Sequence, residues 1–167
     1  MLAKKTVLIL GAGASYDCGF PTGYNLLKAI SKLCQHPEPE TNFEHLLKAC
    51  QVNIQKARDL SAVINKGHWI SVDSLLEDRE EFLDVGKAAI AYVLRPYENP
   101  DALTDIEKRQ VSWYPYLFAQ MKQNNLASFA RNPLTIITFN YDRSIDAYLR
   151  QCAGQVSRPH SCPNSEI

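Results

Sequence analysis

The sequence has no surplus of charge and no long apolar run, and both absences exclude classes of function. Lys plus Arg and Asp plus Glu each number 18, so the formal net charge is zero. A neutral chain offers no broad electrostatic field for binding nucleic acid or an anionic membrane. The apolar run Thr6–Leu10 is shorter than the core of a signal peptide, which needs about 7–15 residues. No segment approaches the roughly 18 apolar residues of a membrane span, so we expect a cytoplasmic protein.

Close pairs of metal ligands are also missing. The five cysteines contain no Cys-x-x-Cys pair, and structural zinc sites usually bring such pairs. The cysteines are Cys18, Cys34, Cys50, Cys152 and Cys162, and we expect free thiols. The histidines His36, His45 and His68 do not pair with one another or with a cysteine at metal-ligand spacing. We therefore expect no metal.

Two β-branched apolar runs predict strands. Thr6–Leu10 ends at a glycine, and Leu134–Phe139 ends at Asn140. Continuous apolar runs of this kind are typical of strands buried on both faces of a parallel sheet. We expect an α/β fold in which the two strands are neighbours in one parallel sheet. Their loops then emerge at the same carboxyl edge, where open α/β sheets bind ligands.

A large and mainly helical insertion is expected between the strands, over about residues 24–130. Three S/T-x-x-E capping boxes punctuate it: Thr41 with Glu44, Ser74 with Glu77, and Thr104 with Glu107. The second box predicts the longest helix, Ser74–Leu94. The aromatic cluster Trp113–Phe118 is expected to pack between helices and sheet. From about residue 151 to residue 167 there is little periodicity, so we predict an irregular tail.

The segment Gly11-Ala12-Gly13, directly after a predicted strand, is a phosphate-loop signal. Glycine lets backbone N–H groups approach a pyrophosphate. The usual dinucleotide fingerprint is incomplete, because its third glycine would fall at Tyr16 and no strand ending in an acid follows. This disfavours an ordinary nicotinamide dehydrogenase. A Walker-type loop is excluded too, since the chain has no Gly-Lys-Ser/Thr.

The extended pattern resembles the sirtuin family. Gly11-Ala-Gly-Ala-Ser15 followed by Gly19-Phe-Pro21 is similar to the sirtuin signature Gly-Ala-Gly-x-Ser and Gly-x-Pro. Thr138-Phe-Asn140-Tyr-Asp142 is similar to the second signature, Thr-Gln-Asn-x-Asp. The resemblance covers about residues 4–148 and is greatest to bacterial sirtuin-like domains of phage-defence proteins. It implies a single, partial domain over residues 1–167, because such domains normally continue with further strands after the second motif.

The resemblance implies an incomplete, Rossmann-like parallel sheet, with strands near residues 6–10 and 134–139, that holds NAD. Gly11, Ala12 and Gly13 would face the pyrophosphate, with Gly19 and Pro21 in the same cradle, and Ser15 would hydrogen-bond a phosphate or ribose. Asn140 would lie beside the nicotinamide ribose, and Asp142 would order that loop or touch nicotinamide. Breaking the nicotinamide–ribose bond builds oxocarbenium-like charge. An uncharged amide can orient water or a ribose hydroxyl there without trapping the cation.

Several features of sirtuin deacylases are altered or missing. Thr22-Gly-Tyr24 stands where deacylases have Asp-Phe-Arg, and their four-cysteine zinc module is absent. His160 lies at the spacing of the general-base histidine, but Ser161 follows it in place of glycine. His160 is therefore either a functional base or a tail residue. These departures weaken deacylation more than NAD cleavage.

Three functions stay open at this stage. The first is an NAD hydrolase that releases nicotinamide and ADP-ribose, in the setting of antiphage defence. The second is a non-catalytic module that binds or senses NAD or ADP-ribose, and the third is an inactive interaction domain. Ser15 could be only a turn cap, Asp142 only a helix N-cap and Asn140 only a turn residue. A homo-oligomer or a partner defence protein is compatible with all three.

Overall fold

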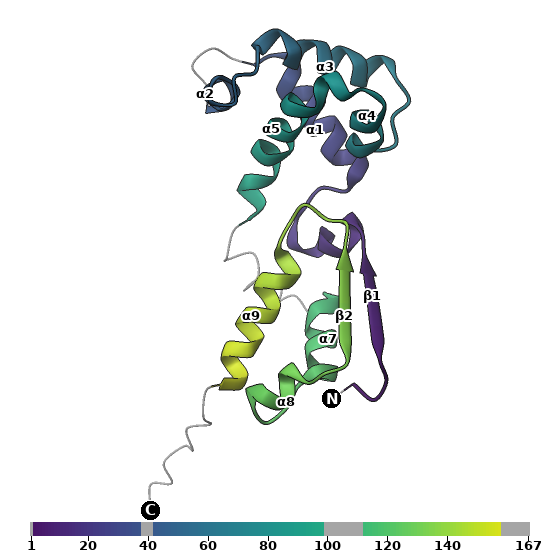
Figure 1. Cartoon of the computed structure of the whole chain (residues 1–167), viewed down its shortest axis with the longest axis vertical. Helices are drawn as coiled ribbons and strands as arrows, with labels where there is room; N and C mark the ends of the chain where they lie inside the picture. Colours follow the sequence, from purple (N-terminus) through teal and green to yellow (C-terminus); the bar gives the residue numbers. More distant parts are fainter. Residues whose placement is uncertain (1, 38–41, 99–111, 158–167) are drawn as a thin grey trace, which may run out of the picture. The chain divides into compact units, whose positions relative to one another are not determined.

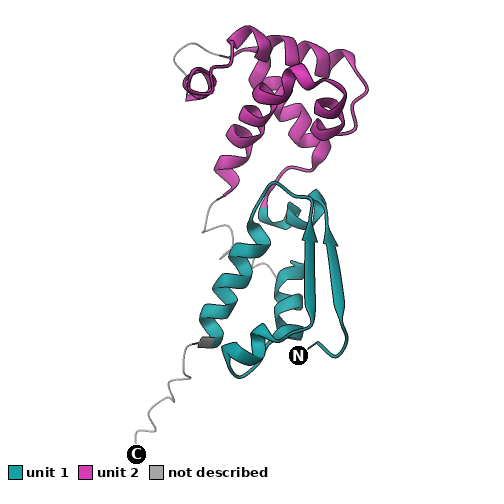
Figure 2. Cartoon of the chain, in the orientation of Figure 1, with its two compact units in different colours: residues 1–18, 99–167 teal, residues 19–98 magenta. Residues whose placement is uncertain are grey.

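The chain forms two compact units, coloured teal and magenta in Figure 2. Unit 1 combines residues 1–18 with residues 99–167, and unit 2 is Gly19–Glu98. The computed structural model describes residues 2–37, 42–98 and 112–157. The fold is α/β, with a small parallel sheet in unit 1 and helices in both units. Among the described helices, none has both the length and the apolar character needed to cross a bilayer.

Unit 1 is built on two parallel strands, β1 (Thr6–Leu10) and β2 (Leu134–Thr138), which lie side by side (Figure 1). Thr6 pairs with Leu134 and Leu10 with Thr138, so the two strands are paired over their whole length. The two predicted strands and their pairing are confirmed. Phe139 follows β2 and still donates its N–H to the carbonyl of Leu10 at 3.0 Å. The loops that follow both strands therefore leave the sheet at one edge.

One face of this sheet is exposed. On β1, Val7 is 58% exposed and Ile9 is 70% exposed. Ile137 on β2 and Phe139 just beyond it are also exposed. The prediction that both strands are buried on both faces is therefore wrong for the described structure. β-branched residues suit a pleated strand whether or not a further layer covers it, so composition alone does not report burial.

Helices from three parts of the chain pack together in unit 1. They are η1 (Ala12–Cys18, a 3-10 helix), α7 (Trp113–Met121), α8 (Leu126–Ala130) and α9 (Ser144–Ser157). Their buried side chains include Tyr114 from α7 and Tyr148 from α9, whose ring centroids are 5.1 Å apart. Trp113 Nε1 donates to the carbonyl of Ala14 at 2.9 Å, which joins α7 to η1.

The predicted irregular tail is wrong for residues 151–157. Helix α9 continues through Ser157, and Cys152 is fully buried one turn after Tyr148. The apolar face that begins at Ile145 thus extends further than the sequence reading allowed. Residues 158–167 lie outside the described residues.

The described secondary-structure elements of unit 2 are all helices. Its elements are α1 (Gly23–Gln35), α2 (Asn42–Ala49), α3 (Ile54–Lys66), α4 (Val72–Asp78), η2 (Glu80–Phe82), α5 (Leu83–Leu94) and η3 (Arg95–Tyr97). The core lies where α1 packs against α3, α4 and α5, and Ile30, Leu60 and Leu75 are fully buried there. Most of the predicted helical block is therefore unit 2, whereas α7 and α8 belong to unit 1.

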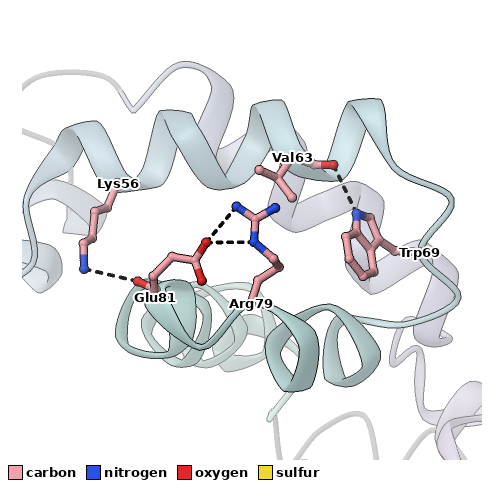
Figure 3. Close-up of polar contacts among 5 residues, drawn as sticks. All are labelled: Lys56, Val63, Trp69, Arg79 and Glu81. Carbon is pink, nitrogen blue, oxygen red and sulfur yellow. Dashed lines mark hydrogen bonds and ion pairs between the residues drawn. The ribbon is translucent and has the colours of Figure 1, made fainter.

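The predicted long helix Ser74–Leu94 is interrupted. Ser71, rather than Ser74, is the N-cap of α4, and Ser71 and Ser74 form the capping box together. At Arg79 the backbone leaves the helical region, with φ −130° and ψ 69°. The Arg79 Nε donates to Glu81 Oε1 at 2.7 Å, and Lys56 Nζ donates to the Glu81 carbonyl at 3.1 Å (Figure 3). Apolar spacing continues across this break, so periodicity did not reveal it.

Candidate functional site

The glycines that follow β1 have open space around them. Gly11, Ala12 and Gly13 are exposed, and the Gly11 carbonyl accepts the N–H of Ala14 at 2.8 Å. A Cβ added at Gly11 or Gly13 would meet nothing within 4 Å. Neither residue has a positive φ, since the one described glycine that has it is Gly19, at 87°. Packing and backbone conformation therefore do not explain these two glycines, whereas close approach of a ligand would.

Ser15 and Asn140, from the two separate sequence motifs, are in direct contact. Ser15 is buried in η1, and its Oγ accepts from Asn140 Nδ2 at 3.0 Å. The same Oγ lies 3.1 Å from Ser144 Oγ. The backbone N–H of Asn140 donates to Thr138 Oγ1 at 3.1 Å, which holds the start of the loop. The structure thus brings together two of the residues predicted to bind or cleave a ligand.

Asp142 organises the start of α9. Its Oδ1 accepts the backbone N–H of Ser144 at 3.0 Å and also the hydroxyl of Ser144. Because α9 begins at Ser144, Asp142 precedes the N-cap position that was predicted for it. The carboxylate still satisfies the first N–H group of the helix, which is what a capping side chain does.

Tyr114 completes a polar cluster that consists of Ser15, Tyr114, Asn140, Asp142 and Ser144, of which Ser15, Tyr114 and Ser144 are buried and Asn140 and Asp142 partly buried. The Tyr114 hydroxyl lies 2.7 Å from Ser144 Oγ, and the Tyr114 side chain is 1% exposed. Burial is the largest influence on this phenol and holds its pKa well above its ordinary value. Tyr114 is therefore a neutral donor near pH 7. Burial likewise raises the pKa of the neighbouring Cys18 thiol, which stays protonated.

The direction of each hydrogen bond in the polar cluster follows from the groups that form it. A carboxylate only accepts, so Ser144 gives its single hydroxyl hydrogen to Asp142. Ser144 Oγ must then accept from both Tyr114 and Ser15. With its hydrogen committed to Ser144, Ser15 can only accept from Asn140. Asn140 must therefore present its NH₂ group to Ser15, which fixes the orientation of the amide.

This orientation leaves one acceptor without a partner. Asn140 Oδ1 is buried and accepts no hydrogen bond from the described part of the chain. A buried acceptor without a donor costs about 1–3 kcal/mol. Such a group in a native protein calls for an explanation, and a donor from a ligand or a bound water supplies one. The polar cluster thus contains one oriented amide oxygen for which the described residues supply no donor.

Sequence reasoning missed Tyr114 and Ser144 as members of the site. The aromatic segment Trp113–Phe118 was expected to be core, and this holds for Tyr114 but not for Tyr116, which is 70% exposed. Ser144 follows Asp142 at the spacing of an Asx turn, so its backbone bond was available from the sequence. Its contact with Tyr114 was not, because it depends on how α7 packs on α9.

The remaining predicted site residues are not part of the polar cluster. Gly19 and Pro21 fall in unit 2, and the polar cluster is formed by unit 1 alone. His160 lies outside the described residues. Within the described ranges, no group of three or more His, Cys, Asp or Glu side chains could hold a metal ion. Comparisons with protein-family models, with curated proteins and with solved structures find no match to this chain.

Proposed function

We propose that unit 1 binds NAD at the carboxyl edge of a Rossmann-like sheet and hydrolyses it to nicotinamide and ADP-ribose. The observation that carries this proposal is the buried Oδ1 of Asn140, which has no donor among the described residues and is held in place through Ser15. Both residues come from motifs that resemble those of sirtuins. Preorganised dipoles of this kind are often a large term in catalysis.

The segment Gly11–Gly13, which leads from β1 into η1, supplies the surface for the pyrophosphate. Its backbone is exposed, and its glycines have no described role in packing. Glycine at these positions lets the backbone N–H groups approach a phosphate closely, as in the loops that follow the first strand of dinucleotide-binding sheets. Ser15 already donates to Ser144 and accepts from Asn140. Its role in the proposal is therefore to orient Asn140 rather than to hold a phosphate.

The chemistry needs only water in addition to NAD. The bond between ribose C1′ and the nicotinamide ring nitrogen breaks, and its electron pair leaves with neutral nicotinamide. The water oxygen bonds to C1′, and one proton passes to solvent. Asn140 Oδ1 accepts a hydrogen bond from the water or from a ribose hydroxyl. A neutral amide does so without forming an ion pair with the positive charge that develops on the sugar.

The test is to incubate the purified chain with NAD and to measure nicotinamide by chromatography. Asn140→Ala should lower the rate about 100-fold or more, as expected for loss of one preorganised polar group. The matched control is Asn124→Ala, because Asn124 is exposed and lies after α7. The control should keep the rate of the unaltered chain. Full turnover by Asn140→Ala would rule out the catalytic role of this residue.

A second candidate is binding of NAD or ADP-ribose without cleavage. One observation favours it: the carboxylate of the polar cluster is already bonded to Ser144 and is not aimed at a ligand as a base. In this case NAD raises the melting temperature through binding to the folded state, while no nicotinamide accumulates. The same pair of variants separates the two candidates. If NAD binds without cleavage, Asn140→Ala alters the shift in melting temperature that NAD causes, and there is no rate of nicotinamide release to alter.

A further inference from the structure

Unit 2 contains a cavity of about 720 Å³. It is lined by α1, by the end of α3 and by the segment that follows α3. Its volume falls in the range of about 300–1,000 Å³ that is usual for small-molecule sites. None of the described residues that line it is an aspartate or a glutamate. The cavity therefore suits a ligand that carries negative charge.

Two lysines on α1 supply positive charge to this cavity. Lys28 and Lys32 stand one helical turn apart, so they share one face of the helix. Both are exposed, and neither forms an ion pair with a residue in the described ranges. Lys28 Nζ lies 4.7 Å from the ring centroid of Tyr24, another lining residue. Lysine ammonium groups are common binders of phosphate.

Trp69 supplies a fixed planar wall. Its Nε1 donates to the carbonyl of Val63 at 3.1 Å (Figure 3). A Cβ at Gly67 would lie 2.1 Å from this Nε1, so the indole can take this place only because residue 67 is glycine. Held indole rings offer a surface on which planar groups stack, worth about 1–3 kcal/mol for a nucleobase.

Hydrogen-bonded side chains order the polar part of the lining. Ser31 is 7% exposed, and its Oγ donates to Asn65 Oδ1 at 2.9 Å. Asn65 Nδ2 in turn donates to Ser61 Oγ at 3.4 Å. The amide of Asn65 is therefore oriented before any ligand arrives, which lowers the entropy lost on binding.

We propose that this cavity binds a small phosphorylated compound with a planar ring, the class that nucleoside monophosphates represent. Lys28 and Lys32 hold the phosphate, and Trp69 supports the ring. The site lies wholly within unit 2. It goes beyond the proposed cleavage of NAD and does not depend on it.

The test uses the full chain with Trp113→Phe, which leaves Trp69 as its single tryptophan, since the sequence has two. Titration with AMP should change the fluorescence of Trp69 saturably, after correction for absorption. Adenosine and inorganic phosphate should each bind at least ten-fold more weakly, because each offers only half of the recognised chemistry. Calorimetric titration of the chain that retains Trp113 should give the same order of affinities.

A pair of double variants identifies the phosphate contacts. Lys28→Gln with Lys32→Gln should weaken AMP binding at least ten-fold. Lys66→Gln with Lys87→Gln is the matched control, because both of these lysines are exposed helical residues of unit 2 that do not line the cavity. The proposal is overturned if AMP gives no saturable signal, if adenosine binds as tightly as AMP, or if both double variants bind alike. The NAD proposal is read by nicotinamide release and this one by the fluorescence of Trp69, which lines the cavity, so failure of either proposal would be visible separately.

Discussion

The Tyr114 hydroxyl lies 2.7 Å from Ser144 Oγ, and both residues are buried. This contact joins α7 to the start of α9 and brings an aromatic helix into the polar cluster. Ser144 in turn contacts Ser15 after β1 and Asp142 after β2. One hydroxyl therefore ties together the three segments on which the proposed NAD site depends.

Tyr114→Phe should lower the free energy of unfolding by about 0.5–1.5 kcal/mol. The substitution keeps the ring and removes one hydrogen bond in the interior, and this range is the usual net value of such a bond. Urea denaturation measures the change. Tyr116→Phe serves as the control and should stay within about 0.5 kcal/mol, because Tyr116 is 70% exposed. Equal midpoints for the two variants would mean that the Tyr114 bond contributes no stability.

Ser144→Ala should lower the turnover of NAD at least ten-fold while KM changes little. Without Ser144, the hydrogen of Ser15 is free to turn toward Asn140, and the amide loses its fixed orientation. Ser144→Thr keeps the hydroxyl and should restore most of the rate. Nicotinamide release, measured below the melting temperature of each variant, distinguishes this positioning role from a loss of fold. If threonine does not rescue the rate, the hydroxyl is not the group that matters.

Gly13→Ala should leave stability within about 0.5 kcal/mol and weaken NAD binding at least ten-fold. The added Cβ meets nothing within 4 Å in the protein, yet it would stand on the surface proposed for the pyrophosphate. Gly154→Ala on α9 is the control, since its Cβ also meets nothing. It should raise stability by about 0.5–1 kcal/mol, as expected within a helix, and should not alter NAD affinity. Calorimetry measures the NAD affinity, and thermal melting measures the stability. An unchanged NAD affinity in Gly13→Ala would mean that the pyrophosphate does not bind at this segment.

Stability should fall as pH rises above about 9, and Cys34 should account for part of this fall. Burial raises the pKa of the Cys34 thiol from 9.0 to about 12 in the folded chain. Between these values the unfolded chain has lost a proton that the folded chain keeps. The free energy of unfolding therefore declines by about 1.4 kcal/mol per pH unit for this group, and the contribution is complete below pH 9.

Denaturation between pH 8 and pH 11 tests the prediction for Cys34. Cys34→Ala should flatten the decline, although it lowers stability at every pH by removing a buried side chain. Cys50→Ala should keep the slope of the unaltered chain, because Cys50 is exposed. The raised pKa of Tyr114 also makes the free energy of unfolding fall with pH, at higher pH than Cys34. This contribution is the same in the unaltered chain and in both alanine variants. Identical slopes for the two alanine variants would contradict the assignment.

The elements of the fold that local sequence determines were predicted well. Thr6–Leu10 and Leu134–Phe139 were recognised as strands because β-branched apolar runs favour extended backbone, and their pairing is as expected. The break at Arg79 was missed, since apolar spacing runs through it; the Arg79 side chain contacts Glu81 just beyond the break. The exposed sheet face was missed because cover by another layer is a tertiary property.

The site was predicted in part for a similar reason. Ser15 and Asn140 were identified from motifs, and both lie in the polar cluster. Tyr114 and Ser144 carry no motif, and their hydroxyls gain a role only when α7 packs against α9. That no described residue donates to Asn140 Oδ1 could not be foreseen either, because it follows from the direction of three hydrogen bonds.

The ordered hydrogens of the polar cluster also decide where protons can travel. The hydroxyl hydrogens of Tyr114 and Ser15 are donated to Ser144, and the hydroxyl hydrogen of Ser144 is donated to Asp142. A proton can hop along such a chain only if every member can take one up and release another, and the NH₂ of Asn140 does not. The relay therefore ends at Ser15. Any proton set free beside Asn140 has to leave through water, out of reach of the carboxylate that keeps the amide in place.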